Sequence, residues 1–388
     1  MTLVAITVFW VSVGVLAYAY AGFPMLLGLA AAVRPRRVQR APVTPTLTLI
    51  IAAYNEEACI GERLANAVRA DYPPENLEII VASDGSSDDT ERIVGEFGHG
   101  VRLLSLPRRG KLAALADAAR EACGSILVFS DANSIVAPDA LRMIARNFAD
   151  PTVGGVVAHT SYRDADAGES SGRGEAMYWE YDTWLKQLES LTGSVVSAHG
   201  GLYAIRRELF QVPADSAVTD DFIISTSVVA HGRRLVFEPA ARAWELPVAT
   251  AQREFARRIR LMTRGMRGVW LRRSLLNPMR HGVYAAVLLT HKVVRRLLFI
   301  PLVAILVATV YLARQSVPFA VLAAGQAAFY GLAALGFAMR STDAGRLRPL
   351  YVPFFYCMAN AAAAVAFVRF IRGERIVSWQ PQRHNAHA

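Results

Sequence analysis

Cysteine is scarce in this sequence, with three residues among 388. Cys59, Cys123 and Cys357 show neither paired spacing nor a metal-ligand pattern, so the sequence excludes a disulfide framework and a structural zinc site. A small, scattered set of cysteines is typical of a reducing compartment. We therefore expect each of the three to behave as a small buried apolar residue.

Glycine-based nucleotide-binding motifs are also missing. Neither G-x-G-x-x-G nor G-x-x-x-x-G-K-[ST] occurs, which argues against a dinucleotide-binding domain and a P-loop. Zinc-finger spacing and RNA-binding signatures are absent as well, so the net charge of +10 does not indicate a nucleic-acid partner. The basic residues cluster beside apolar runs instead, which indicates membrane lipids as partners.

Long apolar runs are what the sequence has in excess, with 53% apolar residues and a mean hydropathy of +0.28. The run at 1–33 is followed by RPRRVQR at 34–40 and has no cleavage site of small residues. We expect an uncleaved transmembrane helix with a cytoplasmic basic end, rather than a signal peptide. Residues 296–371 predict about three more spans, near 296–313, 317–339 and 349–371.

Between these runs lies a strongly basic stretch, because residues 253–296 hold twelve Arg or Lys residues and one acid. Its mixture of cations with apolar residues predicts amphipathic helices in the membrane interface over 251–295; a solvated basic face is the alternative. If the middle domain lies inside, three full spans place the basic polar tail 372–388 outside and the basic loop 341–348 inside. The positive-inside rule would keep both basic segments inside. A re-entrant run, or a hairpin in the first run, would resolve this conflict.

The middle of the chain, residues 41–250, alternates strand and helix patterns, which predicts an α/β domain with a mostly parallel sheet. Strands are expected at 47–53, 77–83, 101–106 and 125–132, and helices at 56–70, 86–97 and 111–123. Ligands bind beyond the carboxyl ends of the strands in such sheets. The strands or the loops after them end here in polar clusters: Asn55-Glu56, Asp84-Gly85-Ser86, Arg109-Gly110-Lys111 and Asp131-Ala132-Asn133.

Six motifs in order resemble the family-2 glycosyltransferases, in particular the membrane-associated type related to cellulose, hyaluronan and poly-N-acetylglucosamine synthases. They are AAYNEE (52–57), ASDGSSDDT (82–90), RGK (109–111), FSDAN (129–133), GGLYAIRRE (200–208) and TDDF (219–222). The resemblance covers about 45–270. It implies a GT-A-type, Rossmann-like fold, flanked by transmembrane and interfacial helices, in a bacterial inner (plasma) membrane protein with a cytoplasmic catalytic domain.

The resemblance also implies a nucleotide-sugar donor, with a UDP-sugar favoured, and a lipid-linked or glycan acceptor. The chain would then build cell-surface polysaccharide or glycolipid, a role that fits contact with polysaccharide-assembly machinery. Donor contacts are expected from two groups of residues. Ala53, Tyr54, Glu56 and Asp84 would surround the base and ribose, and Lys111, Asp131 and Arg260 would face the diphosphate. A capped helix start for Glu56 and an Asx-turn for Asp84 are the structural alternatives.

Asp131 and Asn133 stand where the family usually has two aspartates separated by one residue. In an extended segment the two side chains point the same way and can hold a divalent cation, Mg²⁺ or Mn²⁺, bound to the donor diphosphate. Asn133 removes one negative charge from this pair. Gly200 and Gly201 would let an acceptor sugar approach the backbone closely.

Asp220 and Asp221 match the family's acidic motif, and the position of Asp221 implies the base that deprotonates the acceptor during inversion. The like charge of Asp220 would raise the pKa of Asp221; an N-cap pair is the alternative. The Gln and Trp that processive members carry near Arg260 are absent, which favours single addition over a processive synthase. A catalytically weak nucleotide-binding regulator remains the alternative from another class.

Overall fold

The computed structural model describes residues 1–98, 100–162, 170–213, 215, 217–245 and 251–376. One eight-stranded sheet, in the order β3-β2-β1-β4-β7-β6-β8-β5, forms the centre of the domain. Part of the polar tail expected at 372–388, residues 377–388, lies outside the described residues. The strands are β1 Leu47–Ala53, β2 Leu77–Asp84, β3 Val101–Leu106, β4 Ile126–Asp131, β5 Ile135–Val136, β6 Val153–Tyr162, β7 Tyr203–Arg206 and β8 Arg234–Glu245.

The first half of the sheet is parallel, as the alternating pattern predicts. Strand β1 pairs in parallel with β2 and β4, and β2 pairs in parallel with β3. All seven residues of β1 are buried, because helices cover both faces of a parallel sheet. The second half is mixed, since β7 is antiparallel to both β4 and β6 while β6 and β8 are parallel. The short strand β5 pairs antiparallel with β8 at the edge.

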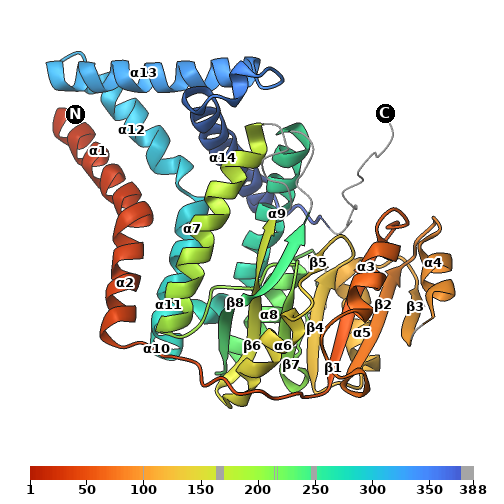
Figure 1. Ribbon diagram of the computed structural model, residues 1–388. Helices are drawn as coiled ribbons and strands as arrows, with labels where there is room; N and C mark the ends of the chain where they lie inside the picture. The colour runs from red at the N-terminus through yellow and green to blue at the C-terminus, as the bar shows by residue number, and fades with distance from the viewer. Residues whose placement is uncertain (99, 163–169, 214, 216, 246–250, 377–388) are drawn as a thin grey trace.

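Helices cover the two faces and divide the core into two layers. One layer packs α3, α4 and α6 against the sheet, with Ile60, Val94 and Ile144 among its buried side chains. The other contains α5, α7 and α8 (Figure 1). The helices are α3 Ile60–Val68, α4 Thr90–Phe97, α5 Lys111–Glu121, α6 Ala140–Ala145, α7 Ser170–Thr192, α8 Asp220–Ala230 and α9 Ala251–Leu271.

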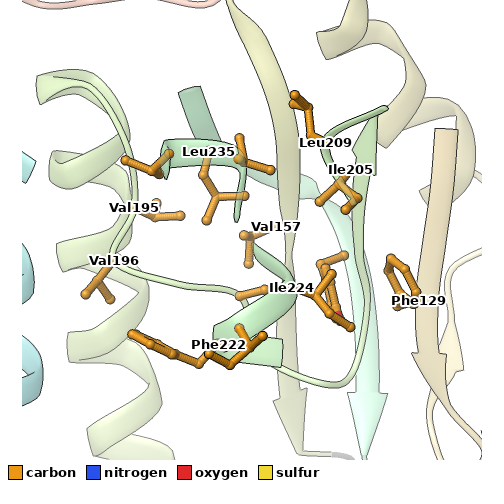
Figure 2. Packing of buried hydrophobic residues seen from close by; sticks show 14 of the residues in the cluster. Phe129, Val157, Val195, Val196, Ile205, Leu209, Phe222, Ile224 and Leu235 are labelled. Atoms are coloured by element: carbon orange, nitrogen blue, oxygen red, sulfur yellow. The ribbon is translucent and has the colours of Figure 1, made fainter. Parts of the chain in front are cut away.

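The second layer continues into the membrane-side part of the chain. Phe222 and Ile224 of α8 pack with Val195 and Val196, as Figure 2 shows. The same cluster includes Phe23 and Leu27 of helix α2 (Phe23–Val33), and Tyr284 and Leu288 of helix α11 (Val283–Leu288). The apolar helices and the eight-stranded sheet therefore share one hydrophobic core.

Three described helical runs are long and apolar enough to cross a membrane: Thr2–Val33, Val317–Ala338 and Arg348–Ile371. The first joins α1 (Thr2–Ala17) to α2, and the others are α13 and α14. Exposed apolar side chains such as Trp10, Val321 and Ile371 point outward from them. Figure 1 shows α1, α12, α13 and α14 gathered at one end of the molecule, away from β1–β3.

The span expected near 296–313 differs from the structure. Helix α12 covers only Phe299–Leu312, which is shorter than the roughly 20 residues that cross a bilayer. It forms one candidate span only together with Val283–Arg296, to which it is joined by a bend of 52°. The bend fits the re-entrant or broken run that the charge conflict suggested.

The basic stretch 251–295 is also packed more deeply than interfacial helices require. Helix α9 lies against α14, where Ile259 packs with Ala362 and Ala366. Within α11, the Tyr284 hydroxyl donates to the Val196 carbonyl at 2.8 Å. A short helix, α10 (Pro278–His281), precedes α11 and exposes Met279. The sequence pattern detected both the cations and the apolar residues of this stretch, but not that the apolar residues pack against other parts of the chain.

Candidate active site

The register of the parallel strands brings the predicted polar residues to one edge. Ala52 of β1 is opposite Asp131 of β4, and Ala53 is opposite Ser83 of β2. Asp84 and Asp131 therefore end neighbouring strands on either side of β1, at the carboxyl edge of the sheet. Ala53 itself has no exposed surface, so neither its side chain nor its backbone lines an open donor pocket in this structure.

Asp84 anchors the loop that precedes α5. Its carboxylate accepts backbone hydrogen bonds from Arg109 at 2.7 Å and Gly110 at 2.9 Å, and one from Arg108 Nη1 at 2.5 Å. Gly85 adopts φ 67°, and a side chain there would come within 2.9 Å of the Arg108 nitrogen. The two loops can approach this closely because the residue after Asp84 is glycine.

Arg108 is the residue that sequence analysis missed at this point. Its guanidinium carbon lies 3.2 Å from the centre of the Tyr54 ring, a cation–π contact, while it also pairs with Asp84. The Arg108 side chain is 34% exposed and that of Asp84 only 1%. Arg108 therefore presents the accessible polar group between Tyr54 and Asp84. The two consecutive arginines before Gly110 are the feature of the sequence that could have pointed to Arg108.

Glu56 lies in the loop between β1 and α3. Its backbone nitrogen donates to Thr90 Oγ1 at 2.8 Å, and its carboxylate accepts from Cys59 Sγ at 3.3 Å. Burial, together with the nearby Asp131 charge, raises the pKa of Glu56 to about 7. Its neighbour Asn55 has φ 53°, a left-handed conformation uncommon outside glycine. Such strained positions are frequent at functional sites.

Lys111 joins two carboxylates from distant parts of the chain. It starts α5, is 8% exposed, and places Nζ 2.5 Å from Asp131 Oδ1 and 2.9 Å from Asp220 Oδ2. Although burial acts to lower the pKa of Lys111, the charges of Asp131 and then Asp220 raise it above its ordinary value. Lys111 is thus a fixed buried cation rather than a side chain extended into solvent.

Asp220 and Asp221 form the first turn of α8, with Thr219 at its N-cap. Burial and then the Asp220 charge raise the pKa of Asp221 to about 6. Burial acts in the same direction on Asp220, but Lys111 and then Arg264 lower its pKa below the ordinary value. The pair therefore divides into an ionised carboxylate and a carboxyl group that titrates near neutral pH, as a general base requires.

The two glycines expected near an acceptor occupy different surroundings. A side chain at Gly200 would lie 2.8 Å from Asp131 Oδ2, so Gly200 borders the carboxylate site. At Gly201 a side chain would meet Thr160 and Glu245 at 2.7 and 2.8 Å. At both positions neighbouring protein atoms therefore lie too close to the backbone for a side chain, so glycine is required by the packing.

Arg260 does not join this cluster: among described residues it makes no hydrogen bond or ion pair with Lys111, Asp131 or Asp220. Burial and then the charges of Arg264 and Arg257 lower its pKa. Arg264, one turn further along α9, donates from Nε to the Val218 carbonyl at 2.9 Å. After Lys111, it is Arg264 that stabilises the Asp220 carboxylate electrostatically, and no sequence pattern distinguishes Arg264 from Arg260.

Two oxygen-bearing side chains are available for a divalent cation. Asp131 ends β4, and the partly buried Asn133 lies two positions later in a turn, not in the extended segment that the sequence predicted. No group of three or more His, Cys, Asp or Glu residues poised for a metal occurs in the described part of the chain. One carboxylate and one amide fit a metal such as Mg²⁺ that takes its remaining ligands from substrate phosphates and water.

Comparison with known proteins identifies the class of this fold and site. The family model "Glycosyltransferase like family 2" matches residues 45–268, and the chain belongs to that family of glycosyltransferases, with a GT-A-type fold. The chain is 25% identical to the mannosyltransferase PcManGT from Pyrobaculum calidifontis, solved with GDP-Man and Mn²⁺. That likeness has a TM-score of 0.73 and covers 95% of this chain and 99% of the other.

Two of the curated relatives are a poly-N-acetylglucosamine synthase and a glucosyldiacylglycerol synthase. Poly-beta-1,6-N-acetyl-D-glucosamine synthase from Staphylococcus aureus is 28% identical over 225 residues, which cover 55% of this chain and 53% of the relative. Beta-monoglucosyldiacylglycerol synthase from Synechocystis is 29% identical over 199 residues, or 48% and 41% of the two chains. The chain therefore spans about half the length of the curated relatives it matches, or less.

Proposed function

We propose that this chain transfers a sugar from a nucleotide-sugar donor to a membrane-proximal acceptor, with inversion at the anomeric carbon. The observation that carries the proposal is the Lys111 ammonium between Asp131 and Asp220, beside Asp221 with its raised pKa. In this arrangement a fixed cation for the leaving diphosphate lies beside a base for the incoming hydroxyl. Geometry of this kind serves group transfer better than binding alone.

In the proposed mechanism, Asp221 accepts the proton of the acceptor hydroxyl as the oxygen attacks the sugar carbon. The bond from that carbon to the nucleoside diphosphate breaks on the opposite face. Lys111 stabilises the charge that develops on the leaving diphosphate. A divalent metal held by Asp131 and Asn133 would supply further charge neutralisation when bound. Asp220 keeps Lys111 in place and keeps the pKa of Asp221 raised.

Tyr54 and Arg108 would receive the donor base, with Asp84 holding their loops together. A planar base stacks favourably on an aromatic ring or a guanidinium. The resemblance favours a UDP-sugar, whereas the structural neighbour was solved with GDP-Man. We retain the UDP-sugar as the first donor to test and the GDP-sugar as the second.

Single addition to a lipid-linked or glycan acceptor is the form we propose, with the catalytic domain on the cytoplasmic face of a bacterial inner membrane. Its support is the likeness to a mannosyltransferase along nearly the whole chain and the absence of the Gln and Trp of processive members. A processive polysaccharide synthase is the second candidate, favoured by the poly-N-acetylglucosamine synthase relative.

The test is nucleotide release by the purified full-length protein in nanodiscs. UDP-, GDP- and dTDP-sugars are each supplied with Mg²⁺, Mn²⁺ or EDTA, with and without a membrane lipid extract. We expect one donor to release nucleotide, with Mg²⁺ or Mn²⁺ increasing the rate and Asp221→Asn abolishing it. The mass of the product separates one addition from a polymer. Nucleotide binding without release from any donor would contradict the proposal and favour a regulatory binding protein.

A further inference from the structure

The segment 289–296 lies where the N-terminal helix meets the catalytic domain. The Tyr18 hydroxyl and Thr290 Oγ1 are 2.9 Å apart, and the rings of Phe23 and His291 are 5.6 Å apart. The segment follows α11 directly and is tied on its other side to α9 and α14 (Figure 1). It therefore borders the apolar helices and, through Lys292 beside Phe222, the start of α8 at the same time.

Two cations on this segment face aromatic rings. Lys292 and Arg295, three residues apart, are both partly buried. Lys292 Nζ lies 5.9 Å from the centre of the Phe222 ring. The Arg295 guanidinium carbon lies 5.4 Å from the centre of the Tyr181 ring, and its Nη1 is 3.5 Å from His291 Nε2. Among described residues, neither cation has a carboxylate within ion-pair distance.

Lys292 also acts electrostatically on the proposed base. Phe222 follows Asp221 in the chain, and the Lys292 charge opposes the rise in the pKa of Asp221 that burial and Asp220 cause. Asp182 is already paired with Lys186 at 2.8 Å. A cation taken partly out of water costs free energy, and the charges of Asp221 and Asp182 offset that cost only from beyond ion-pair distance. A ligand that brings its own negative charge would offset that cost.

The surroundings indicate an anion attached to an apolar chain. Leu289 is 46% exposed and Ile300 is 49% exposed, so exposed apolar side chains flank the two cations along the sequence. Helix α12 starts at Phe299, and its Val303 and Val307 are also exposed. These side chains belong to the candidate bent span formed by Val283–Arg296 and Phe299–Leu312, so a lipid could reach the two cations along this apolar surface, whereas a free inorganic anion gains nothing from it.

We propose that Lys292 and Arg295 bind the phosphate group of a lipid acceptor and thereby place its reactive hydroxyl against Asp221. This inference rests on the proposed function and names the acceptor class, a phosphorylated lipid rather than a neutral one. Lysine and arginine both bind phosphate oxygens strongly through charge-assisted hydrogen bonds. Here Lys292 and Arg295 are positioning residues, and proton transfer remains with Asp221.

The first experiment separates the membrane lipid extract by anion exchange into neutral and anionic fractions. Each fraction is offered to the full-length protein with its preferred donor. We expect transfer to lipids of the anionic fraction only. In Lys292→Gln, the KM for these lipids should rise by about tenfold or more, while the affinity for the donor nucleotide, measured by calorimetry, stays as in the wild type. Lys292→Arg should restore most of the loss.

Arg273→Gln is the matched control. Arg273 also contacts a ring without a carboxylate, with its guanidinium carbon 5.3 Å from the centre of the Trp270 ring, but it is exposed. The loss of Arg273 should change neither the KM for the lipids nor the KM for the donor. Because acceptor-free donor hydrolysis tests the proposed function separately, an inactive donor site and a wrong acceptor class give different results.

A binding experiment covers the case in which no natural acceptor is found. Dodecyl phosphate should raise the unfolding temperature of the wild type but not of Lys292→Gln, because only a ligand of the folded state stabilises it. Butyl phosphate and inorganic phosphate at the same concentration should have little effect if the apolar chain contributes. Transfer to the neutral fraction, or equal stabilisation of both proteins by dodecyl phosphate, would overturn the proposal.

Discussion

Asp220 and Asp221 are consecutive residues in the first turn of α8, yet their pKa values move in opposite directions. Lys111 accounts for the difference, because its ammonium lies 2.9 Å from Asp220 Oδ2. Burial and then the charge of Asp220 raise the pKa of Asp221. One buried lysine thus gives two adjacent carboxyl groups different roles.

Replacing the proposed base should remove turnover and leave donor binding. In Asp221→Asn we expect kcat to fall by about 10² or more, the range for a lost general base, with nucleotide affinity changed little. Donor affinity is measured by calorimetry and kcat by nucleotide release. Asp89→Asn, which loses an exposed pair with Arg92, is the control and should keep full activity. A full-rate Asp221→Asn enzyme would remove Asp221 from the mechanism.

The raised pKa of Asp221 predicts a pH profile with a defined sign. The base acts only when deprotonated, so kcat/KM should fall as the pH drops through about 6. In Asp220→Asn one negative charge beside Asp221 is gone, so this acid limb should move to lower pH. The profile is measured between pH 5 and 8 at saturating metal. An acid limb that moves upward, or stays fixed, would contradict the proposed coupling.

Removing the Lys111 charge should affect stability as well as donor binding. Lys111→Met would leave Asp131 and Asp220 buried without their cation, and breaking such a pair costs about 3–5 kcal/mol. We expect a lower unfolding temperature and a higher KM for the donor. Both defects should shrink in the double variant Lys111→Met, Asp220→Asn, which restores the charge balance. If the double variant were no more stable than the single one, the three groups would not act as a unit.

Gly200 offers a test of the carboxylate site without a change of charge. In Gly200→Ala the added carbon would lie 2.8 Å from Asp131 Oδ2, so the carboxylate must move. We expect weaker activation by Mn²⁺, seen as a higher metal concentration at half-maximal rate. Gly95→Ala is the control, since a side chain there meets nothing within 4 Å. An unchanged metal response in Gly200→Ala would show that Asp131 Oδ2 takes no part.

The parallel half of the fold was predictable because local pattern and tertiary structure agree there. Continuous apolar runs predicted the bounds of β1 and β3, the end of β2 to within one residue, and both ends of β4 to within one residue. The strand ends then placed Asp84 and Asp131 correctly on one edge. The mixed half was not predictable in this way, because β5 and β7 have only two and four residues and the pairing of β6 with β8 shifts register twice.

Within the site, residue types were easier to predict than partners. Lys111 and Asp220 are 109 positions apart in the sequence, and only the fold brings them together. Arg108 and Arg264 were missed for a related reason. Each is one of several nearby arginines, and burial and contacts decide which of them faces a carboxylate or a ring. For the same reason Arg260 was selected instead of Arg264.

The core shared by the sheet and the apolar helices has a practical consequence for any attempt to simplify this enzyme. A fragment limited to residues 41–250 would lack Phe23, Leu27, Tyr284 and Leu288, which pack in the same cluster as Phe222 and Ile224. The first turn of α8, which carries both aspartates, would then rest on a surface open to water. Proteolytic trimming of the apolar helices should therefore inactivate the catalytic centre itself, even where every motif residue is retained.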